Sequence, residues 1–353
     1  MFFNNNNNIR LNNIKSLKVA LTYNIKPDVN EDTACNNDEF AEWDTEETIF
    51  AVRDALSIYH NVILIEADIN CYNKLIETNP DIVFNIAEGK RGINREAFIP
   101  SVCEFLDIPY TGSDPLTLSS TLHKARTKEI LIYNNIHTPK YRLIENISRV
   151  DDCSYLLPAV VKPLSEGSSK GIYNSCLVYD THHLYTKIEE TLTTYKQPCI
   201  VEHFLNGREF TVALLGNKNC LQVLPIVEIN FSALPMDLAP IYSFEAKWVA
   251  DTTENPLDIF TCPAVITPDL EQNIIKTAIK SFNILGCRDW GRIDIRLDEN
   301  NIPNIIEINP LPGILPNPSS NSCYPKAARA AGLNYNEMIN RVLLAGCKRY
   351  NIQ

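Results

Sequence analysis

The chain has 353 residues, 45% of them hydrophobic, and a net charge of −11. This length can bury two or three domain cores. The sequence has no long basic tract and no run of about 18 apolar residues, so neither nucleic acid nor a membrane is expected as a partner. The 11 cysteines are scattered without CxxC spacing, and the N-terminus lacks an apolar signal region. Both features favour reduced thiols and a cytoplasmic location.

The first third of the chain predicts an α/β unit. Residues 1–16 are rich in asparagine and are expected to be a disordered tail. Across 17–112, apolar strand patterns alternate with helical spacing, which predicts a parallel sheet covered by helices. Ligands of such sheets bind at the carboxyl ends of the strands. The expected strands span 18–23, 61–67 and 81–89, and the expected helices span 45–59 and 95–107.

Two further units follow, at 113–202 and 203–353. In the first we expect a helix over 122–135, strands at 159–163 and 199–204, and a small-residue loop at 164–171. In the second we expect strands at 208–216 and 221–229, helices at 268–284 and 335–345, and a hairpin within 291–313. The whole chain is therefore predicted to be α/β with α+β units.

The hairpin GRIDIRLDENNIPNIIEINPLPG is the strongest candidate site. A turn centred between residues 300 and 301 places Asp294 opposite Glu307 and Arg292 opposite Asn309. Two acids that face each other repel unless positive charge lies between them. Two carboxylates and an amide are oxygen ligands that suit Mg²⁺. The alternative interpretation is a solvent-facing strand with ordinary polar residues.

The segment VVKPLSEGSSKG, residues 160–171, is a candidate phosphate site. Lys162 ends an apolar strand, and the backbone N–H groups of the following small residues can cradle phosphate oxygens. The order of a Walker loop is absent. The alternative is a flexible exposed turn. Lys124 and Lys247, each taken alone, read as solvated surface lysines.

A third candidate is the strand–turn–strand CIVEHFLNGREFTVALLG, residues 199–216. Backbone groups here could read the edge of an adenine ring, and the Glu202 or Glu209 carboxylate could bind a ribose. The alternative is a hairpin with surface carboxylates.

Taken in order, Lys124, KPxxEGSSKG, VExFxxGREFTV, EAKW, GRIDIRLD and EINPLPG resemble the ATP-grasp superfamily, and within it the D-alanine–D-alanine ligases. The resemblance covers residues 17–350. It implies an N-terminal parallel-sheet domain followed by two α+β domains that hold ATP between them. It also implies two Mg²⁺ ions, with Mn²⁺ as a substitute, amino-acid substrates, and a homodimer by family precedent. Such enzymes phosphorylate a carboxylate and then let an amine displace the phosphate.

The resemblance also assigns roles to matching residues. Phosphates would be held by Lys124, Lys162 and Lys247 and covered by the loop Glu166, Gly167, Ser168 and Ser169. The adenine would meet Glu202, His203, Phe204 and Leu205, and the ribose would meet Glu209. Asp294, Glu307 and Asn309 would be the metal ligands. Arg292 and the Gly313 amide would stabilise the oxyanion, and Ser168 would be catalytic with them. Ser322 would touch a substrate carboxylate, and Glu88 would lie in the substrate site.

The sequence departs from the family pattern on the side of the first amino acid. The Gly-Gly-x-Ser-x-Glu turn after the first strand is missing, and its ammonium-binding glutamate has three candidate replacements, Glu42, Asp44 and Glu46. Glu88 stands where the family has a histidine, and Trp248 stands where it has a tyrosine. The ATP and Mg²⁺ positions are all retained.

The leading hypothesis is therefore an ATP-dependent ligase that makes D-Ala-D-Ala or a close analogue. The first alternative is a peptide ligase of secondary metabolism with other substrates. A catalytically inactive nucleotide-binding protein and a kinase are weaker alternatives, because Arg292, Asp294, Glu307, Asn309 and Gly313 are all present.

Overall fold

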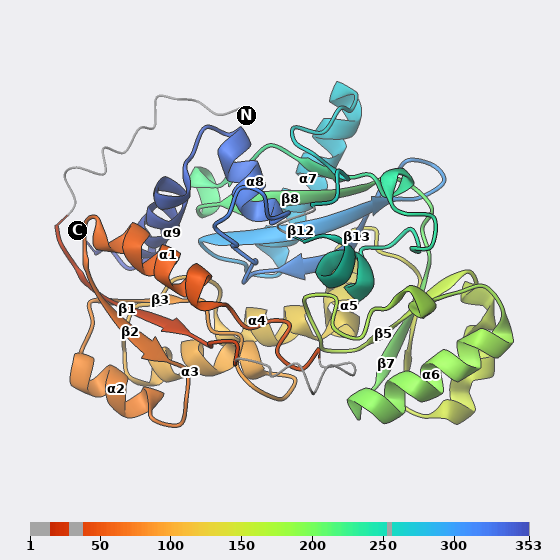
Figure 1. The fold of residues 1–353 in the computed structure, drawn as a ribbon, viewed down its shortest axis with the longest axis horizontal. Coiled ribbons are helices and arrows are strands. Elements are labelled where there is room, and N and C mark those ends of the chain that lie inside the picture. Colours follow the sequence, from red (N-terminus) through yellow and green to blue (C-terminus); the bar gives the residue numbers. More distant parts are fainter. Residues whose placement is uncertain (1–14, 28–37, 253–255, 353) are drawn as a thin grey trace.

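A computed structural model describes residues 15–27, 38–252 and 256–352. Most of the predicted asparagine-rich tail, residues 1–14, lies outside the described residues. The described chain contains three β-sheets with helices packed on them (Figure 1). The predicted mixture of helix and sheet is confirmed.

The first sheet is parallel, as predicted, in the order β2-β1-β3. Its strands are almost fully apolar where they face the covering helices, and helix α1 packs against the C-terminal helix α9. The C-terminus of the chain therefore returns to the N-terminal sheet (Figure 1). The elements are β1 (Lys18–Tyr23), α1 (Glu46–Ser57), β2 (Asn61–Glu66), α2 (Cys71–Thr78), β3 (Ile82–Asn85), α3 (Phe98–Phe105) and α9 (Tyr335–Arg349).

The second sheet is antiparallel, in the order β4-β7-β5-β6, with α6 against β5. The predicted helix over 122–135 is wrong at its start, because His123 has an extended backbone that separates α4 from α5. The ring Nδ1 of His123 accepts the backbone N–H of Arg126, so Lys124 begins α5. The elements are α4 (Pro115–Leu122), α5 (Lys124–Tyr133), β4 (Tyr141–Ile144), β5 (Ala159–Pro163), β6 (Leu177–Val178), α6 (Thr181–Tyr195) and β7 (Cys199–His203).

The third sheet has the order β11-β10-β8-β12-β13, and β9 also pairs with β8. The single strand predicted at 221–229 is wrong: it is two short strands, because Pro225 lies between them and cannot donate a ladder hydrogen bond. The elements are β8 (Glu209–Leu215), β9 (Gln222–Val223), β10 (Val227–Ile229), a π-helical turn (Glu245–Ala250), β11 (Phe260–Thr261), α7 (Pro268–Ile284), β12 (Trp290–Leu297), β13 (Pro303–Asn309) and α8 (Cys323–Ala330).

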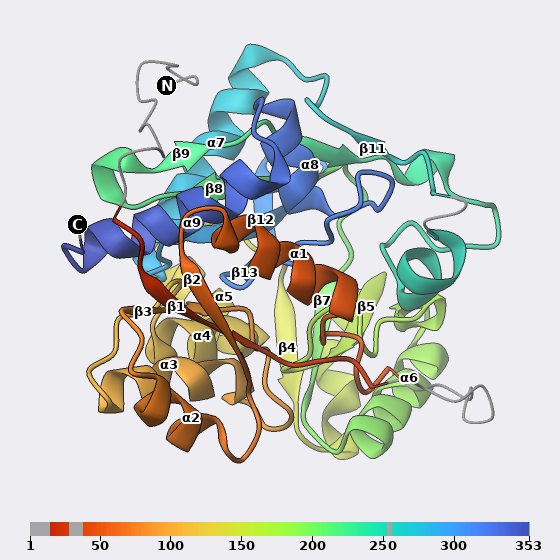
Figure 2. The same cartoon turned by 60° about the vertical axis from the view of Figure 1, so that its left-hand side comes forward.

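The two faces of the third sheet have different environments. Ile293 and Ile295 of β12 are fully buried in a cluster with Phe282 of α7. The alternate residues Arg292 and Asp294 lie on the opposite face. Figure 2 shows this sheet above the second sheet. The polar face of β12 is thus held in place by a closely packed apolar face.

The β12–β13 hairpin has the predicted register, for a reason that the sequence did not reveal. Asp294 is opposite Glu307 and Arg292 is opposite Asn309. The pairing shifts between Asp294 and Ile295, however, and Ile306 has no partner on β12. The turn is centred on residue 300, half a residue earlier than predicted. The bulge compensates for this shift and restores the predicted pairing of Asp294 with Glu307.

Candidate functional site

Two neighbouring cavities contain every predicted site residue. The larger, of 480 Å³, lies between the second and third sheets, and the smaller, of 90 Å³, shares residues with it. A third cavity, of 1120 Å³ beside α9, contains none of the predicted residues. The 480 Å³ cavity, called the cleft below, is lined by Lys162, Ser168, Ser169, Glu202, His203, Phe204, Leu205, Glu209, Lys247, Arg292, Asp294, Glu307, Gly313 and Ser322. The smaller cavity, called the chamber below, is lined by Glu88, Lys124, Glu166, Gly167 and Asn309, and again by Ser168, Lys247, Arg292, Glu307 and Gly313.

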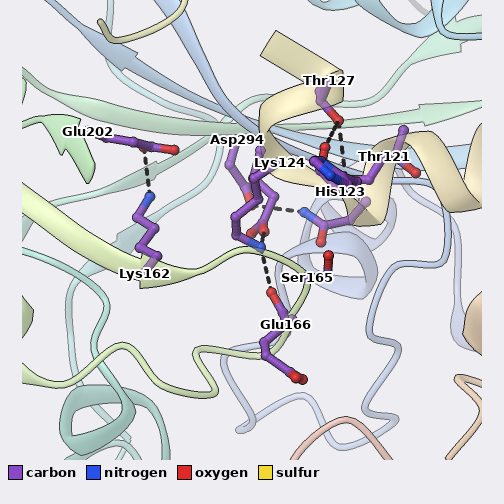
Figure 3. A network of polar contacts seen from close by, with 12 residues as sticks. Thr121, His123, Lys124, Thr127, Lys162, Ser165, Glu166, Glu202 and Asp294 are labelled. Atoms are coloured by element: carbon purple, nitrogen blue, oxygen red, sulfur yellow. Dashed lines mark hydrogen bonds and ion pairs between the residues drawn. The ribbon is translucent and has the colours of Figure 1, made fainter. Parts of the chain in front are cut away.

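Glu202 is a buried carboxylate between two lysines. Its oxygens lie 3.0 Å from Lys162 Nζ on β5 and 3.2 Å from Lys128 Nζ on α5. Figure 3 shows Lys162 and Glu202 facing each other. Burial alone would raise the pKa of Glu202, but the two lysines outweigh it and lower the pKa to about 2. Sequence reasoning missed Lys128, because a lysine inside a helix carries no signal of burial.

Asp294 is held in place from three strands. Its carboxylate accepts hydrogen bonds from the Arg292 guanidinium at 2.9 and 3.0 Å, from the Thr211 hydroxyl of β8, and from the Asn309 amide at 3.1 Å. Thr211 lies directly opposite Asp294 in the β8–β12 ladder. The Asn309 amide nitrogen is the donor here, so its oxygen remains an available acceptor.

Lys124 connects the hairpin to the loop at 164–171. Its Nζ lies 2.7 Å from Glu307 Oε1 and donates a short hydrogen bond to the Glu166 carbonyl (Figure 3). Although burial opposes ionisation, Lys124 keeps the pKa of Glu307 below its ordinary value. Glu307 is therefore ionised at neutral pH.

The chemistry of Asp294, Glu307 and Asn309 fits a hard divalent cation. All three offer oxygen atoms, and the cations Arg292 and Lys124 now neutralise the two carboxylates. Within the described residues, no group of three or more His, Cys, Asp or Glu side chains is placed to hold a metal by itself. The three residues would thus need further oxygen ligands, such as phosphate groups or water.

The loop at 164–171 has an unusual backbone that neighbouring segments support. Ser168 and Ser169 have φ values of 50° and 61°, which non-glycine residues adopt only at a cost. The Trp248 indole N–H donates to the Ser168 carbonyl at 3.1 Å, and the Ser169 hydroxyl donates to the Tyr242 carbonyl at 2.9 Å. Trp248 thus joins two loops that flank the cleft.

Lys247 faces the cleft without a carboxylate partner among the described residues. Its Nζ lies 4.9 Å from the centre of the Trp248 ring. Burial, with a smaller effect from Arg292, lowers the pKa of Lys247 to about 8. A half-buried ammonium with no ion-pair partner among the described residues is suited to an anion that enters the cleft.

Two further groups of contacts hold side chains that line the cleft. Arg296 pairs with Glu209 at 3.1 Å and stacks over Phe204, with its guanidinium 4.6 Å from the ring centre. Ser322 precedes α8, and its hydroxyl donates to the Gly313 carbonyl at 3.0 Å. The role of Arg296 could not be assigned from the sequence, because its partners lie on other segments.

The structure separates the three candidate acids that follow the first strand. Glu42 pairs with buried Arg95 and accepts the Gly167 N–H, so it supports the loop at 164–171. Glu46 is exposed in the first turn of α1. Asp44 alone lines both cavities without a side-chain partner among the described residues. Sequence reasoning did not find Arg95, which comes from a distant turn.

Known proteins share sequence with most of this chain. The family model described as D-ala D-ala ligase C-terminus matches residues 131–344. The chain is 33% identical to a D-alanine–D-alanine ligase of Carboxydothermus hydrogenoformans over 81% of this chain and 88% of that protein. It is 36% identical to the uncharacterized protein y4sG of Sinorhizobium fredii over 76% of this chain and 75% of that protein.

Solved structures share the fold. A D-alanine–D-alanine ligase from Bacillus anthracis, complexed with ATP, has a TM-score of 0.69 at 21% identity and covers 95% of this chain and 99% of that chain. The VanG D-Ala:D-Ser ligase from Enterococcus faecalis has a TM-score of 0.68 at 20% identity, with 94% and 100% covered. The extent of the family-model match and of the curated relatives, together with the fold, shows that the chain belongs to the D-alanine–D-alanine ligase family and has the ATP-grasp fold.

Proposed function

We propose that this protein is an ATP-dependent ligase that joins the carboxylate of one amino acid to the amine of a second, making D-Ala-D-Ala or a close analogue. The observation that carries this proposal is the Asp294–Glu307 pair. These two carboxylates face each other across β12 and β13, in a cleft that also contains Lys162 and Lys247. Such a surface suits a triphosphate with its cations.

In the first step, an oxygen of the substrate carboxylate attacks the γ-phosphorus of ATP, and the bond to the ADP oxygen breaks. Lys124, Lys162 and Lys247 would hold the phosphates, with the loop at 164–171 covering them. Residues 202–205 would meet the adenine and Glu209 the ribose. Asp294, Glu307 and Asn309 would hold Mg²⁺, two ions by family precedent, with Mn²⁺ as a substitute; the metal neutralises phosphate charge.

In the second step, the amine of the second amino acid attacks the acyl carbon, and phosphate leaves. The Arg292 guanidinium and the Gly313 backbone N–H would stabilise the oxyanion, and donors of this kind contribute about 3 to 4 kcal/mol each. Ser322 would touch the carboxylate of the second substrate. Excluding water matters, because an acyl phosphate hydrolyses readily. The Trp248–Ser168 hydrogen bond supports closure of the two loops.

A ligase for other amino acids is the second candidate function. It is favoured by the position of Glu42, which pairs with Arg95 and is not available as the ammonium partner of the first substrate. The differences from the family pattern lie on that substrate's side, whereas the amine side keeps Arg292, Gly313 and Ser322.

We also propose a homodimer in the cytoplasm. Phe105 of α3 and Leu116 of α4 are 79% and 77% exposed, and these two helices contact each other. Burial of these two apolar side chains against a second copy would remove them from water, which supports a dimer. None of the described cysteines forms a disulfide, which supports a reducing compartment. No described helix has the length and apolar character that a membrane span requires.

The test is phosphate release from ATP and Mg²⁺ over a panel of single and paired D- and L-amino acids, with the mass of each product recorded. Phosphate together with a dipeptide mass supports the ligase. A phosphorylated amino acid without free phosphate would indicate a kinase. No nucleotide turnover with any pair, while ATP still binds, would indicate an inactive nucleotide-binding protein.

A further inference from the structure

The chamber next to the oxyanion residues is lined by more carboxyl groups than the cations of the protein pair with. Six acids face it, and three of them already have partners. Glu42 pairs with Arg95, Glu307 with Lys124, and Glu166 with Lys170 at 3.1 Å. The other three are Asp44, Glu88 and Glu96.

These three acids, called the acid triad below, have no ion pair or side-chain hydrogen bond within residues 15–27, 38–252 and 256–352. Glu96 is the most enclosed, since only 9% of it is exposed although it lines the chamber. Burial raises the pKa of Asp44 to about 7 and that of Glu96 to about 8. Burial and the charge of Glu96 raise the pKa of Glu88 as well. Carboxyl groups in such a site need donors from a ligand.

The chamber lies where the first amino acid must sit. It shares Arg292, Gly313, Lys247 and Glu307 with the cleft, so its contents lie beside the reacting carboxylate and the phosphates. At this end Arg292 pairs with Asp294 and Lys124 pairs with Glu307, and Lys247 would hold a phosphate under the proposed function. A cation held by the acid triad must therefore belong to the amino acid itself.

One α-ammonium group neutralises one carboxylate. The triad has three acids, so two of them would remain without a partner. The methyl group of alanine would contact these acids and donate no hydrogen bond to either of them. A second amino group on the side chain would bring three more N–H donors and a second positive charge to the same site.

We propose that the acid triad binds the first substrate through two amino groups, so that the acyl donor is a diamino carboxylic acid. This inference rests on the proposed function, and it specifies which analogue of D-alanine occupies the first position. Asp44, which lines both cavities, lies where it can take the α-ammonium, and Glu88 and Glu96 lie where they can take the side-chain ammonium.

The test uses hydroxylamine in place of the second amino acid. The hydroxylamine nitrogen attacks the acyl carbon of the acyl phosphate, the bond to the phosphate oxygen breaks, and a hydroxamate, phosphate and a proton are formed. The assay thus reports the first substrate alone. The full-length protein is given ATP, Mg²⁺ and either D-alanine or one amino acid from three matched pairs, each tested as the D and the L form. The pairs are 2,3-diaminopropionate with 2-aminobutyrate, ornithine with norvaline, and lysine with norleucine.

We expect at least one diamino acid to exceed its matched monoamino acid by about tenfold or more in kcat/KM, because each additional charge-assisted hydrogen bond contributes at that scale. Equal or better use of the monoamino partners, or of D-alanine, would overturn the diamino assignment and leave the ligase proposal standing. No hydroxamate from any amino acid would instead contradict the acyl-phosphate chemistry itself.

Substitutions test whether the acid triad binds the diamino acid. Glu96→Gln should lower the preference for the diamino acid by about tenfold through KM, with the KM for ATP unchanged. The control is Glu46→Gln, which removes an exposed acid near Asp44 and should change neither value. If Glu96→Gln unfolds, judged by circular dichroism, Glu88→Gln is measured in its place. An unchanged preference in a folded variant of either residue would overturn the role of the triad.

Discussion

Glu202 lies between Lys162 and Lys128, with its oxygens 3.0 and 3.2 Å from the two ammonium groups. All three side chains are almost fully buried, and Lys128 also donates to the Thr138 hydroxyl at 2.8 Å. One carboxylate therefore supports two lysines, and one of these faces the cleft. The strand β7 that carries Glu202 is fixed to α5 through the same contact.

The first prediction concerns this group. Glu202→Gln leaves two buried ammonium groups without a counter-charge, so we expect the free energy of unfolding to fall by about 3 to 5 kcal/mol. The measurement is urea denaturation. The control is Glu129→Gln, which breaks an exposed pair with Arg126 and should cost less than about 1 kcal/mol. Equal losses in the two variants would contradict the structural role of Glu202.

The second prediction concerns the contact between the two loops. Trp248→Phe keeps an aromatic ring beside Lys247 but removes the N–H that binds the Ser168 carbonyl. We expect the KM for ATP to rise by about three- to tenfold, the range that one hydrogen bond supplies. The ratio of phosphate released to peptide formed should also rise, because water reaches the acyl phosphate. A ratio that stays at one would show that this contact does not exclude water.

The third prediction tests the metal ligands. Asp294→Asn should abolish phosphate release, by about a hundredfold or more, because the amide cannot supply the negative charge that a divalent cation requires. Chelation of Mg²⁺ should have the same effect on the unaltered protein and be reversed by added Mg²⁺. The control is Glu299→Gln at the exposed tip of the same hairpin. A fully active Asp294→Asn protein would falsify the assignment.

Part of the β12–β13 hairpin can be predicted from the sequence. Period-two alternation predicts that Arg292 and Asp294 share a face, and the pairing of Asp294 with Glu307 follows from an assumed turn position. The structure confirms both. It reaches that register by a bulge at Ile306, which alternation cannot reveal, because an apolar residue at that position fits either face.

The acid triad could be predicted from the sequence only in part. Glu88 could be placed by its position in the family pattern, but Asp44 could not be chosen over Glu42 or Glu46. Exposure excludes Glu46, and the ion pair with Arg95 excludes Glu42. Both depend on contacts across the fold, because Arg95 comes from a turn about fifty residues away. The spacing of residues along the chain does not predict contacts between such distant segments.

The fourth prediction is a pH dependence of nucleotide binding. The pKa of Lys247 is lowered to about 8, so its positive charge is present below pH 8 and is lost as the pH rises through that value. We therefore expect the KM for ATP to increase between pH 7 and pH 9. Lys247→Arg keeps its charge over this range and should flatten the increase. The measurement is the KM for ATP at half-unit steps, and equal slopes in the two proteins would contradict the prediction.

The fifth prediction is a pH dependence of stability. The folded protein raises the pKa of Glu96 from 4.5 to about 8, so between these values the folded state binds more protons than the unfolded state. Stability must then fall as the pH rises from about 4.5 to 8. We expect Glu96→Gln to remove part of this fall and to be more stable than the unaltered protein at pH 8.5, by on the order of 3 kcal/mol. Urea denaturation without ligands at pH 5.5 and 8.5 measures both effects. A pH slope equal to that of the unaltered protein would mean that Glu96 is ionised at neutral pH, and hence that a counter-charge already lies beside it.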